Sequence, residues 1–184
     1  MSSTTLKGTH FLMCDNWIPH IQLSHDEPVK YCEIGVFYGH NLLRFAELFP
    51  KAELTGIDPW LDYNEYNEYK GEINTIYEGF KENLAADPNR DRITIHRGFS
   101  HNVLKEYPAQ HFDIVYIDGN HEFQFVVADA ELAYQKVKVG GYIIFDDVDW
   151  ETVQKAFFHF LDKYKDSIRY EALVYSQTIC RRVG

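Results

Sequence analysis

The sequence lacks the features that mark disulfide-stapled, zinc-bound or membrane-inserted proteins. Its 184 residues include three cysteines, and none of them forms a CxxC pair, which argues against a disulfide framework and a cysteine zinc site. The first residues lack the apolar stretch of a secretory signal, and no apolar run approaches the length that crosses a bilayer. We therefore expect a protein of a reducing, cytoplasmic compartment with no membrane partner.

Basic residues are also scarce. Lys and Arg total 18 against 28 Asp and Glu, which gives a formal net charge of -10. The basic clusters are short, Arg90 to Arg97 and Arg181-Arg182, and a surface this acidic repels a phosphate backbone, so nucleic acid is not the expected substrate. The composition is 45% hydrophobic and 16% aromatic, which excludes a disordered chain and, at this length, favours one packed domain.

Strand patterns alternate with helix patterns along most of the chain. Runs of β-branched and aromatic residues predict strands at 29–36, 54–57, 93–96, 112–117 and 142–145. Apolar residues at helical spacing predict helices at 41–49, 72–86, 123–137 and from 150 onward. Two closing strands are predicted at 170–175 and 178–183. This alternation predicts an α/β fold with a doubly wound, mostly parallel sheet, helices on both faces and a closing antiparallel strand pair.

The chain shows no internal repeat, low-complexity tract or interdomain linker, so we expect a single domain over residues 1–184. Apolar residues at helical spacing within 8–25 predict an N-terminal helix. Residues 1–28 are therefore interpreted as a helical cover and 29–184 as the core. Such a helix is also a surface through which two copies of a small enzyme can pair, and the sequence leaves open whether the protein is a homo-oligomer.

Two of the predicted strands end in aspartates. Asp118 closes one of them, and Asp146 and Asp147 close the next. Because the carboxyl ends of parallel strands meet at the ligand-binding edge of an open α/β sheet, these carboxylates and the nearby His121 predict a reaction site. The simpler alternatives are a turn aspartate at 118, a helix N-cap at 146–147 and a histidine that only lines a pocket.

The first strand turns into its helix through two glycines, Gly35 and Gly39. Without a Cβ they permit a tight turn and a close approach of a ligand to the backbone, although their spacing is not the GxGxxG dinucleotide fingerprint. Asp58 ends the second strand, where an acid can accept hydrogen bonds from the ribose hydroxyls of an adenosine. Phe99 and Ser100 follow the third strand at the same edge. The glycines and Asp58 could instead serve only their local turns.

Five motifs follow one another along the chain: EIGxxxG from Glu33, IDPW from Ile57, RGFS from Arg97, IDGxH from Ile117 and GGYIIFDD from Gly140. This set resembles the class I S-adenosylmethionine-dependent methyltransferases, and among them the branch of macrolide-sugar and aminocoumarin-sugar O-methyltransferases. The resemblance implies a Rossmann-like sheet of seven strands that binds S-adenosylmethionine. By position, it implies that Glu33, Gly35 and Gly39 frame the methionine end of this cofactor. Asp58 would bind the ribose, and Phe99 with Ser100 would border the adenine.

The same resemblance implies a chemistry for the aspartates. Sugar O-methyltransferases of that branch hold a divalent metal with aspartates that match Asp118, Asp146 and Asp147, and three hard oxygen ligands suit Mg²⁺. Some members have a histidine general base that matches His121, and others have an acid at the position of Asn120, which is an amide here. His121 is therefore the candidate base, and Asp118 is predicted to serve the catalytic, metal and cofactor sites together.

These features predict methyl transfer to an oxygen of a small polar or sugar-like acceptor with the help of a divalent metal. Three alternatives stay open: a metal-independent methyltransferase with another small acceptor, a catalytically inactive cofactor-binding domain, and a nucleotide-sugar glycosyltransferase with its metal motif at 146–149. The sequence does not identify the acceptor. In the run from Trp60 to Tyr69, aromatic rings alternate with acids and amides, which indicates either a lid that faces substrate or a solvated helical turn. Trp60 itself, two residues after Asp58, is expected to cover one face of the cofactor base or the substrate mouth.

Overall fold

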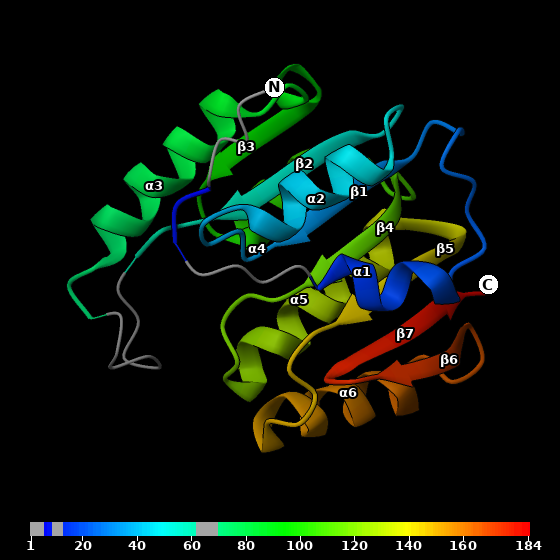
Figure 1. The fold of residues 1–184 in the computed structure, drawn as a ribbon. Coiled ribbons are helices and arrows are strands. Elements are labelled where there is room, and N and C mark those ends of the chain that lie inside the picture. The colour runs from blue at the N-terminus through cyan, green and yellow to red at the C-terminus, as the bar shows by residue number, and fades with distance from the viewer. Residues whose placement is uncertain (1–5, 9–12, 62–69) are drawn as a thin grey trace.

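The computed structural model describes residues 6–8, 13–61 and 70–184. Seven strands form one sheet in the order β3-β2-β1-β4-β5-β7-β6 (Figure 1). The first five strands run parallel, and β7 pairs antiparallel with both β5 and β6. The strands are β1 (Lys30–Ile34), β2 (Glu53–Asp58), β3 (Ile93–Arg97), β4 (Phe112–Ile117), β5 (Val137–Phe145), β6 (Ile168–Val174) and β7 (Gln177–Arg182).

Helices cover both faces of this sheet. The longer ones are α2 (His40–Leu48), α3 (Ile73–Ala86), α5 (Phe123–Lys136) and α6 (Glu151–Lys163), and the short ones are α1 (Cys14–Trp17) and α4 (Ser100–Val103). Buried residues of α1, α2 and α3 belong to the core on one face, and those of α5 and α6 to the core on the other. In Figure 1, α1 and α2 lie in front of the strands, with α5 and α6 on the far side. The predicted doubly wound sheet with its closing antiparallel pair is confirmed.

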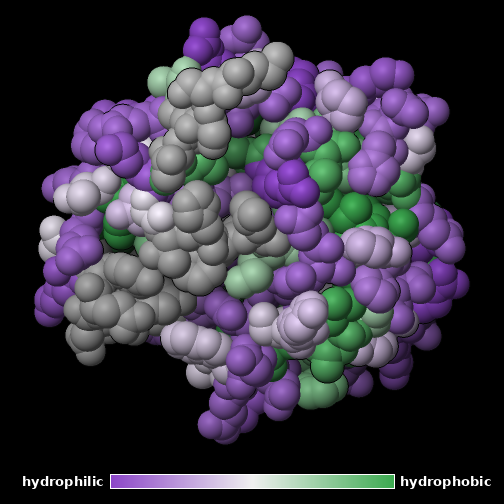
Figure 2. Space-filling view, viewed as in Figure 1, coloured by the Kyte–Doolittle hydropathy of each residue, from purple (hydrophilic) through white to green (hydrophobic). Residues whose placement is uncertain are grey.

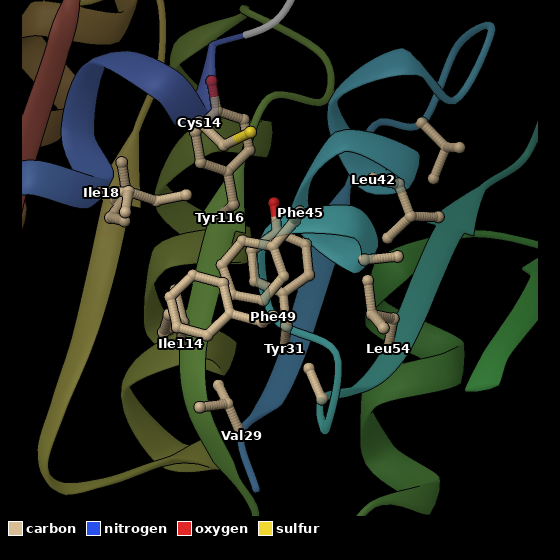
Figure 3. Close-up of a cluster of buried hydrophobic side chains, with 14 of the residues drawn as sticks. Cys14, Ile18, Val29, Tyr31, Leu42, Phe45, Phe49, Leu54, Ile114 and Tyr116 are labelled. Atoms are coloured by element: carbon tan, nitrogen blue, oxygen red, sulfur yellow. The ribbon is translucent and has the colours of Figure 1, made fainter. Parts of the chain in front are cut away.

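Aromatic rings fill the core beneath α1 and α2. The rings of Tyr31 and Phe45 stack at 4.0 Å, those of Phe45 and Phe49 stack at 4.4 Å, and Trp17 of α1 stacks on Phe45 at 5.8 Å. Figure 3 shows the rings of Tyr31, Phe45 and Phe49 between α2 and the strands, with Cys14 of α1 above them. Each buried ring removes apolar surface from water, which stabilises the fold by roughly 2–3 kcal/mol. This packing holds α1 and α2 firmly on the sheet.

The structure differs from the predicted elements at two places. Of the helix predicted within 8–25, the described part is the single turn α1 followed by a 3-10 turn at Ile18–His20, and residues 9–12 lie outside the described residues. Strand β5 begins at Val137 instead of 142. Gly140 (φ +88°) lies at a register irregularity between β4 and β5, so this glycine bends a strand that continues past it.

Polar side chains cover most of the face seen in Figure 2, and apolar side chains appear between them in separate patches. No helix in the described ranges is long and apolar enough to span a membrane.

Candidate active site

The carboxyl ends of the parallel strands open into a cavity of about 460 Å³. Strands β1 and β4 are neighbours in the sheet. From β1 the strand order continues to β2 and β3 on one side, and from β4 it continues to β5 on the other side. Such a switch point leaves a crevice between the loops that follow the two strands. All the predicted site residues except Gly39 line this cavity: Glu33, Gly35, Asp58, Phe99, Ser100, Asp118, His121, Asp146 and Asp147.

The two glycines after β1 have backbone reasons to be glycines. Gly35 (φ +87°) and Gly39 (φ +82°) both lie in the left-handed region, which other residues rarely adopt. A Cβ on Gly35 would overlap the carbonyl oxygen of Asp118, and a Cβ on Gly39 would lie 2.8 Å from the Phe80 ring. The turn therefore runs directly against the end of β4, and its backbone forms one wall of the cavity.

Asp58 fixes this turn from the end of β2. Its Oδ2 accepts hydrogen bonds from the backbone N–H groups of Val36 (2.9 Å) and Phe37 (3.0 Å), and its Oδ1 accepts one from Trp60 (2.6 Å). Burial raises the pKa of the Asp58 carboxyl, and the three backbone donors oppose that rise. Asp58 thus lines the cavity as predicted and also holds the glycine turn in place.

Trp60 lies elsewhere than we expected. We interpreted it as a cover for the cofactor base or the substrate mouth, but its side chain is 1% exposed and does not line the cavity. Its ring packs on Tyr77 and Phe80 of α3, each at 4.8 Å, and its Nε1 donates to the carbonyl of Phe37 at 3.0 Å. Trp60 therefore anchors the loop to α3. Residues 62–69 of the run to Tyr69 lie outside the described residues.

Glu33 is a buried acid near the end of β1, the middle one of the five parallel strands. Its Oε2 accepts hydrogen bonds from the Tyr31 hydroxyl (2.6 Å) and Asn41 Nδ2 (2.8 Å). Burial raises the pKa of the Glu33 carboxyl to about 8. Asn41 Oδ1 in turn accepts a hydrogen bond from the backbone N–H of Cys14 at 2.7 Å, so α1 is held beside the part of the cavity that Glu33 and Asn41 line. The sequence did not lead us to predict this role of Asn41, because its pattern does not distinguish a buried asparagine from an exposed one at the start of a helix.

His121 lies between two carboxylates at the ends of β4 and β5. Its Nε2 is 3.2 Å from Asp147 Oδ2 and 3.7 Å from Asp118 Oδ1, and its ring packs against Trp150 at 4.9 Å. One ligand atom from each of the three residues lies within 4.8 Å of the others, as in a metal site. Burial, reinforced by the charge of Asp146, raises the pKa of the Asp118 carboxyl well above its usual range. The predicted meeting of Asp118, Asp147 and His121 at this edge is observed.

Asp146 points into the protein. Its Oδ2 accepts hydrogen bonds from the Tyr116 hydroxyl and from Gln177 Nε2 (3.3 Å). Its Oδ1 accepts from the Ser176 hydroxyl (3.1 Å) and from the backbone N–H of Asp147 (2.8 Å). The last bond braces Asp147 in a left-handed conformation, φ +51°. Both Asp146 oxygens are thus engaged by protein donors, whereas the Asp147 carboxylate faces His121.

Ser100, next to Phe99, contacts a residue that the sequence did not lead us to expect. The Ser100 hydroxyl donates a hydrogen bond to Asp129, a carboxylate of α5 that is 6% exposed and also lines the cavity. Burial raises the pKa of Asp129 to about 6. The sequence pattern could have indicated that Asp129 is buried, because it lies on the apolar face of α5. It is three residues after Val126 and four before Ala133, and both of these are buried.

A parallel sheet with a glycine turn after β1, an acid after β2 and a deep cavity at the switch point defines an α/β enzyme that binds a nucleoside-containing cofactor. A family model described as a methyltransferase domain matches residues 32–148, more than half of the chain. The chain belongs to this family, and the class is that of the class I S-adenosylmethionine-dependent methyltransferases.

Known proteins resemble this chain in sequence or in fold. The uncharacterized protein R132 of Acanthamoeba polyphaga mimivirus is 31% identical over 133 residues, which cover 66% of this chain and 52% of R132. The matched part thus spans about half the length of that relative. The O-methyltransferase NovP superposes with a TM-score of 0.67 at 17% identity over 85% of this chain and 73% of NovP. CalS11, a TDP-rhamnose 3'-O-methyltransferase, has a TM-score of 0.58 at 19% identity over 84% of this chain and 71% of CalS11. At these identities the two structures show a shared fold.

Proposed function

We propose that this protein transfers the methyl group of S-adenosylmethionine to an oxygen of a small polar or sugar-like acceptor, with help from a divalent cation. The observation that carries the proposal is the position of His121 Nε2 between Asp118 and Asp147, in the same cavity as the glycine turn. Because Gly35 lies against the Asp118 carbonyl, the cofactor turn and the reactive side chains share a wall. Residues 29–184 would form the catalytic core and 1–28 its cover.

The cofactor would lie along the edge of the sheet from β1 to β3. Glu33 would bind the ammonium of its methionine end, with the backbone of Gly35 and Gly39 beside it. Asp58 keeps acceptor capacity for a ribose hydroxyl, because a carboxylate has about four lone-pair sites and three backbone donors use the others. Phe99 and Ser100 would border the adenine. This orientation brings the sulfonium between Glu33 and Asp58, next to Asp118.

The reaction needs an aligned nucleophile and a proton acceptor. The acceptor oxygen forms a bond to the methyl carbon, the carbon–sulfur bond breaks, and its electron pair stays on the sulfur of S-adenosylhomocysteine. The hydroxyl proton would pass to His121 Nε2, and the neighbouring Asp147 and Asp118 carboxylates would stabilise the resulting imidazolium. Holding the oxygen in line with the methyl group is the larger part of the catalysis that the protein has to supply.

The donor set around His121 fits a divalent cation. The carboxylates of Asp118 and Asp147 offer oxygen atoms within 4.8 Å of each other, and such oxygens suit Mg²⁺ or Mn²⁺, which leaves His121 Nε2 to act as the base. We propose Asp118 and Asp147 as the first ligands, since both carboxylates face His121. Asp146, the third predicted ligand, would have to exchange its hydrogen bonds with Tyr116, Ser176 and Gln177 to reach the ion. When bound, the cation lowers the pKa of an acceptor hydroxyl and fixes its direction.

A metal-independent methyltransferase is the second candidate, and one contact favours it. The 3.2 Å separation of His121 Nε2 from Asp147 Oδ2 suits an imidazolium–carboxylate pair, so Asp147 could stabilise the protonated base without an ion between them. The same nitrogen cannot ligate an ion and accept a proton at once. Metal content and metal dependence of turnover therefore decide between the two candidates.

The charges that line the cavity restrict the acceptor. Among the described lining residues, the ionisable side chains are six acids and three histidines, with no Lys or Arg. Phe125 and Trp150 add half-exposed aromatic surface beside His121. A cavity of this kind repels phosphates and favours an uncharged or cationic acceptor with an apolar or ring-shaped face. TDP-rhamnose, the substrate for which CalS11 is named, carries a diphosphate that would find no cationic side chain among those lining residues.

Calorimetric titration with S-adenosylmethionine and S-adenosylhomocysteine, with Mn²⁺, with Mg²⁺ and with EDTA, tests the proposal. Micromolar affinity is expected, and its absence in every condition would rule out the methyltransferase function. Methyl transfer to methyl rhamnoside and to TDP-rhamnose then compares a neutral acceptor with its diphosphate counterpart. Faster transfer to the diphosphate would contradict the expected charge preference. Cofactor binding without transfer to any of a broad set of hydroxyl compounds would support an inactive cofactor-binding domain.

A further inference from the structure

Gln177 is a buried glutamine whose presence its own contacts do not explain. It is the first residue of β7, and its side chain is 0% exposed. Its Nε2 makes two long hydrogen bonds of 3.3 Å, to the Tyr116 hydroxyl and to Asp146 Oδ2. Its Oε1 is buried and has no hydrogen-bond partner among the residues that the structure describes. A buried acceptor without a partner destabilises a fold, so a leucine would suit a purely structural position better.

Tyr116 and Gln177 hold the Asp146 carboxylate on its inner side. Tyr116 of β4 is also 0% exposed, and its hydroxyl donates to Asp146 Oδ2. The other two donors to Asp146 are the Ser176 hydroxyl and the backbone N–H of Asp147, and both bonds are only partly buried, so water can replace the carboxylate there. Asp146 lines the cavity. If its carboxylate turns into the cavity, the Tyr116 hydroxyl needs a new acceptor inside the protein.

Rotation of the Gln177 amide supplies that acceptor. Half a turn exchanges Nε2 and Oε1, which brings Oε1 within hydrogen-bond distance of the Tyr116 hydroxyl. We propose that Gln177 takes over the Tyr116 hydroxyl when Asp146 turns into the cavity to ligate a divalent cation. One end of the amide lacks a partner in either orientation, so the exchange leaves no additional buried group unpaired. The proposal rests on the proposed function, because the cation is the one that Asp118 and Asp147 hold there.

Two simpler roles of Gln177 predict different effects on cation binding. If Gln177 only restrains Asp146, removal of its amide releases the carboxylate, and the affinity for the cation rises. If Gln177 only fills space, that affinity stays unchanged. In the exchange, removal of the amide leaves the Tyr116 hydroxyl unpaired once Asp146 has turned, and the affinity falls. The sign of the change therefore separates the three roles.

The experiment is Mn²⁺ titration of the full-length wild-type protein and of Gln177→Leu, monitored by electron paramagnetic resonance. Leucine is close to glutamine in volume and also removes the unpaired Oε1, so we expect the variant to fold, and denaturant titration checks this. We expect its Mn²⁺ affinity to fall about tenfold, which is the effect of a buried hydroxyl left without an acceptor. An unchanged or higher affinity would overturn the proposal and leave the cation site in place.

Tyr116→Phe provides the matched control. It removes both the bond that keeps Asp146 turned inward and the hydroxyl that needs an acceptor, so Mn²⁺ affinity is expected to rise. In this background Gln177→Leu should no longer lower the affinity, because no hydroxyl is left unpaired. The same tenfold loss in both backgrounds would overturn the proposal.

Tyr116→Phe also tests the turn of Asp146 by itself, whether or not Gln177→Leu folds. An unchanged Mn²⁺ affinity in Tyr116→Phe would show that Asp146 stays turned inward, and the exchange would fail. A wild type that binds no Mn²⁺ would remove the cation site and this proposal with it. Binding of S-adenosylhomocysteine by the same protein would then still support the methyltransferase function.

Discussion

The α-carbon of Gly35 lies directly against the backbone carbonyl of Asp118. This contact joins the end of β1 to the end of β4, the two strands between which the chain changes direction. A Cβ at position 35 would push the glycine turn away from Asp118 and therefore from His121. The distance between the glycine turn and His121, the proposed base, therefore depends on the absence of one Cβ.

The first prediction concerns Gly35→Ala. The new methyl group would overlap the Asp118 carbonyl, and φ +87° is unfavourable for alanine, so we expect about 3 kcal/mol of destabilisation and loss of S-adenosylhomocysteine binding. Gly140→Ala is the matched control, because Gly140 has φ +88° but nothing within 4 Å of a Cβ. It should cost only the backbone strain, about 1 kcal/mol, and leave binding unchanged. Denaturant titration and calorimetry measure both, and equal losses in the two variants would contradict the close contact.

The second prediction concerns Asp58. Asp58→Ala removes the acceptor for a ribose hydroxyl and for the N–H groups of Val36, Phe37 and Trp60, so both cofactor affinity and thermal stability are expected to fall. Asp58→Asn keeps one acceptor oxygen and should lie between the wild type and the alanine variant in both. Titration with S-adenosylhomocysteine well below the midpoint of unfolding separates the two effects. Unchanged affinity in Asp58→Ala would exclude a ribose contact.

The third prediction separates two adjacent aspartates. Asp147→Asn should weaken Mn²⁺ binding with little change in stability, because its carboxylate faces His121 in the cavity. Asp146→Asn should lower the free energy of unfolding by about 1–3 kcal/mol, because the new NH₂ would face two donors whichever oxygen it replaces. Mn²⁺ titration monitored by electron paramagnetic resonance measures the metal affinity of both variants, and thermal unfolding measures their stability. Retained Mn²⁺ affinity in Asp147→Asn would remove that residue from the metal site.

The fourth prediction follows from the pKa of Glu33, which burial raises from 4.5 to about 8. In the cofactor-free protein this acid stays protonated after the unfolded chain has lost its proton, so its contribution to stability falls as the pH rises from about 4.5 to about 8. An ammonium ligand favours the ionised form, so binding releases a proton below pH 8. We therefore expect the affinity for S-adenosylhomocysteine to rise between pH 6 and pH 8, by up to about tenfold per pH unit.

Glu33→Gln isolates that effect. The amide cannot ionise, so the variant should bind more weakly at pH 8 and lose most of the pH dependence, while the free protein gains stability at that pH relative to the wild type. The exposed Glu53→Gln serves as the control and should change neither quantity. Calorimetry across the pH range gives the affinities. An identical pH profile in wild type and Glu33→Gln would show that Glu33 does not bind the ammonium.

The parts of the fold that depend on local pattern were predictable from the sequence. The buried strands are runs of Ile, Val and Tyr, and the acids that end them fall at one edge because the strands are parallel. Strand β4 was placed at the residues observed, 112–117. The same logic predicted that Asp118, Asp146, Asp147 and His121 lie at one edge of the sheet.

What could not be predicted depends on partners far apart in the chain. The direction of the Asp146 carboxylate is set by Tyr116 and Gln177, which reach it from β4 and β7. Trp60 was expected at the mouth of the cavity, but it packs against Tyr77 and Phe80 of α3. Burial of its ring against theirs is more favourable than exposure to water. Asp129 was overlooked because an acid in a helix is ordinarily a surface residue.

Strand β7 lies between β5 and β6 although it follows both in the chain. During synthesis, β6 therefore has no neighbour in the sheet until β7 has left the ribosome, and the edge of β5 stays open for the same interval. Ser176 and Gln177, which hold Asp146, arrive with that last segment. A nascent chain would therefore form the glycine turn early, and the proposed reaction centre would be complete only once β7 has been inserted.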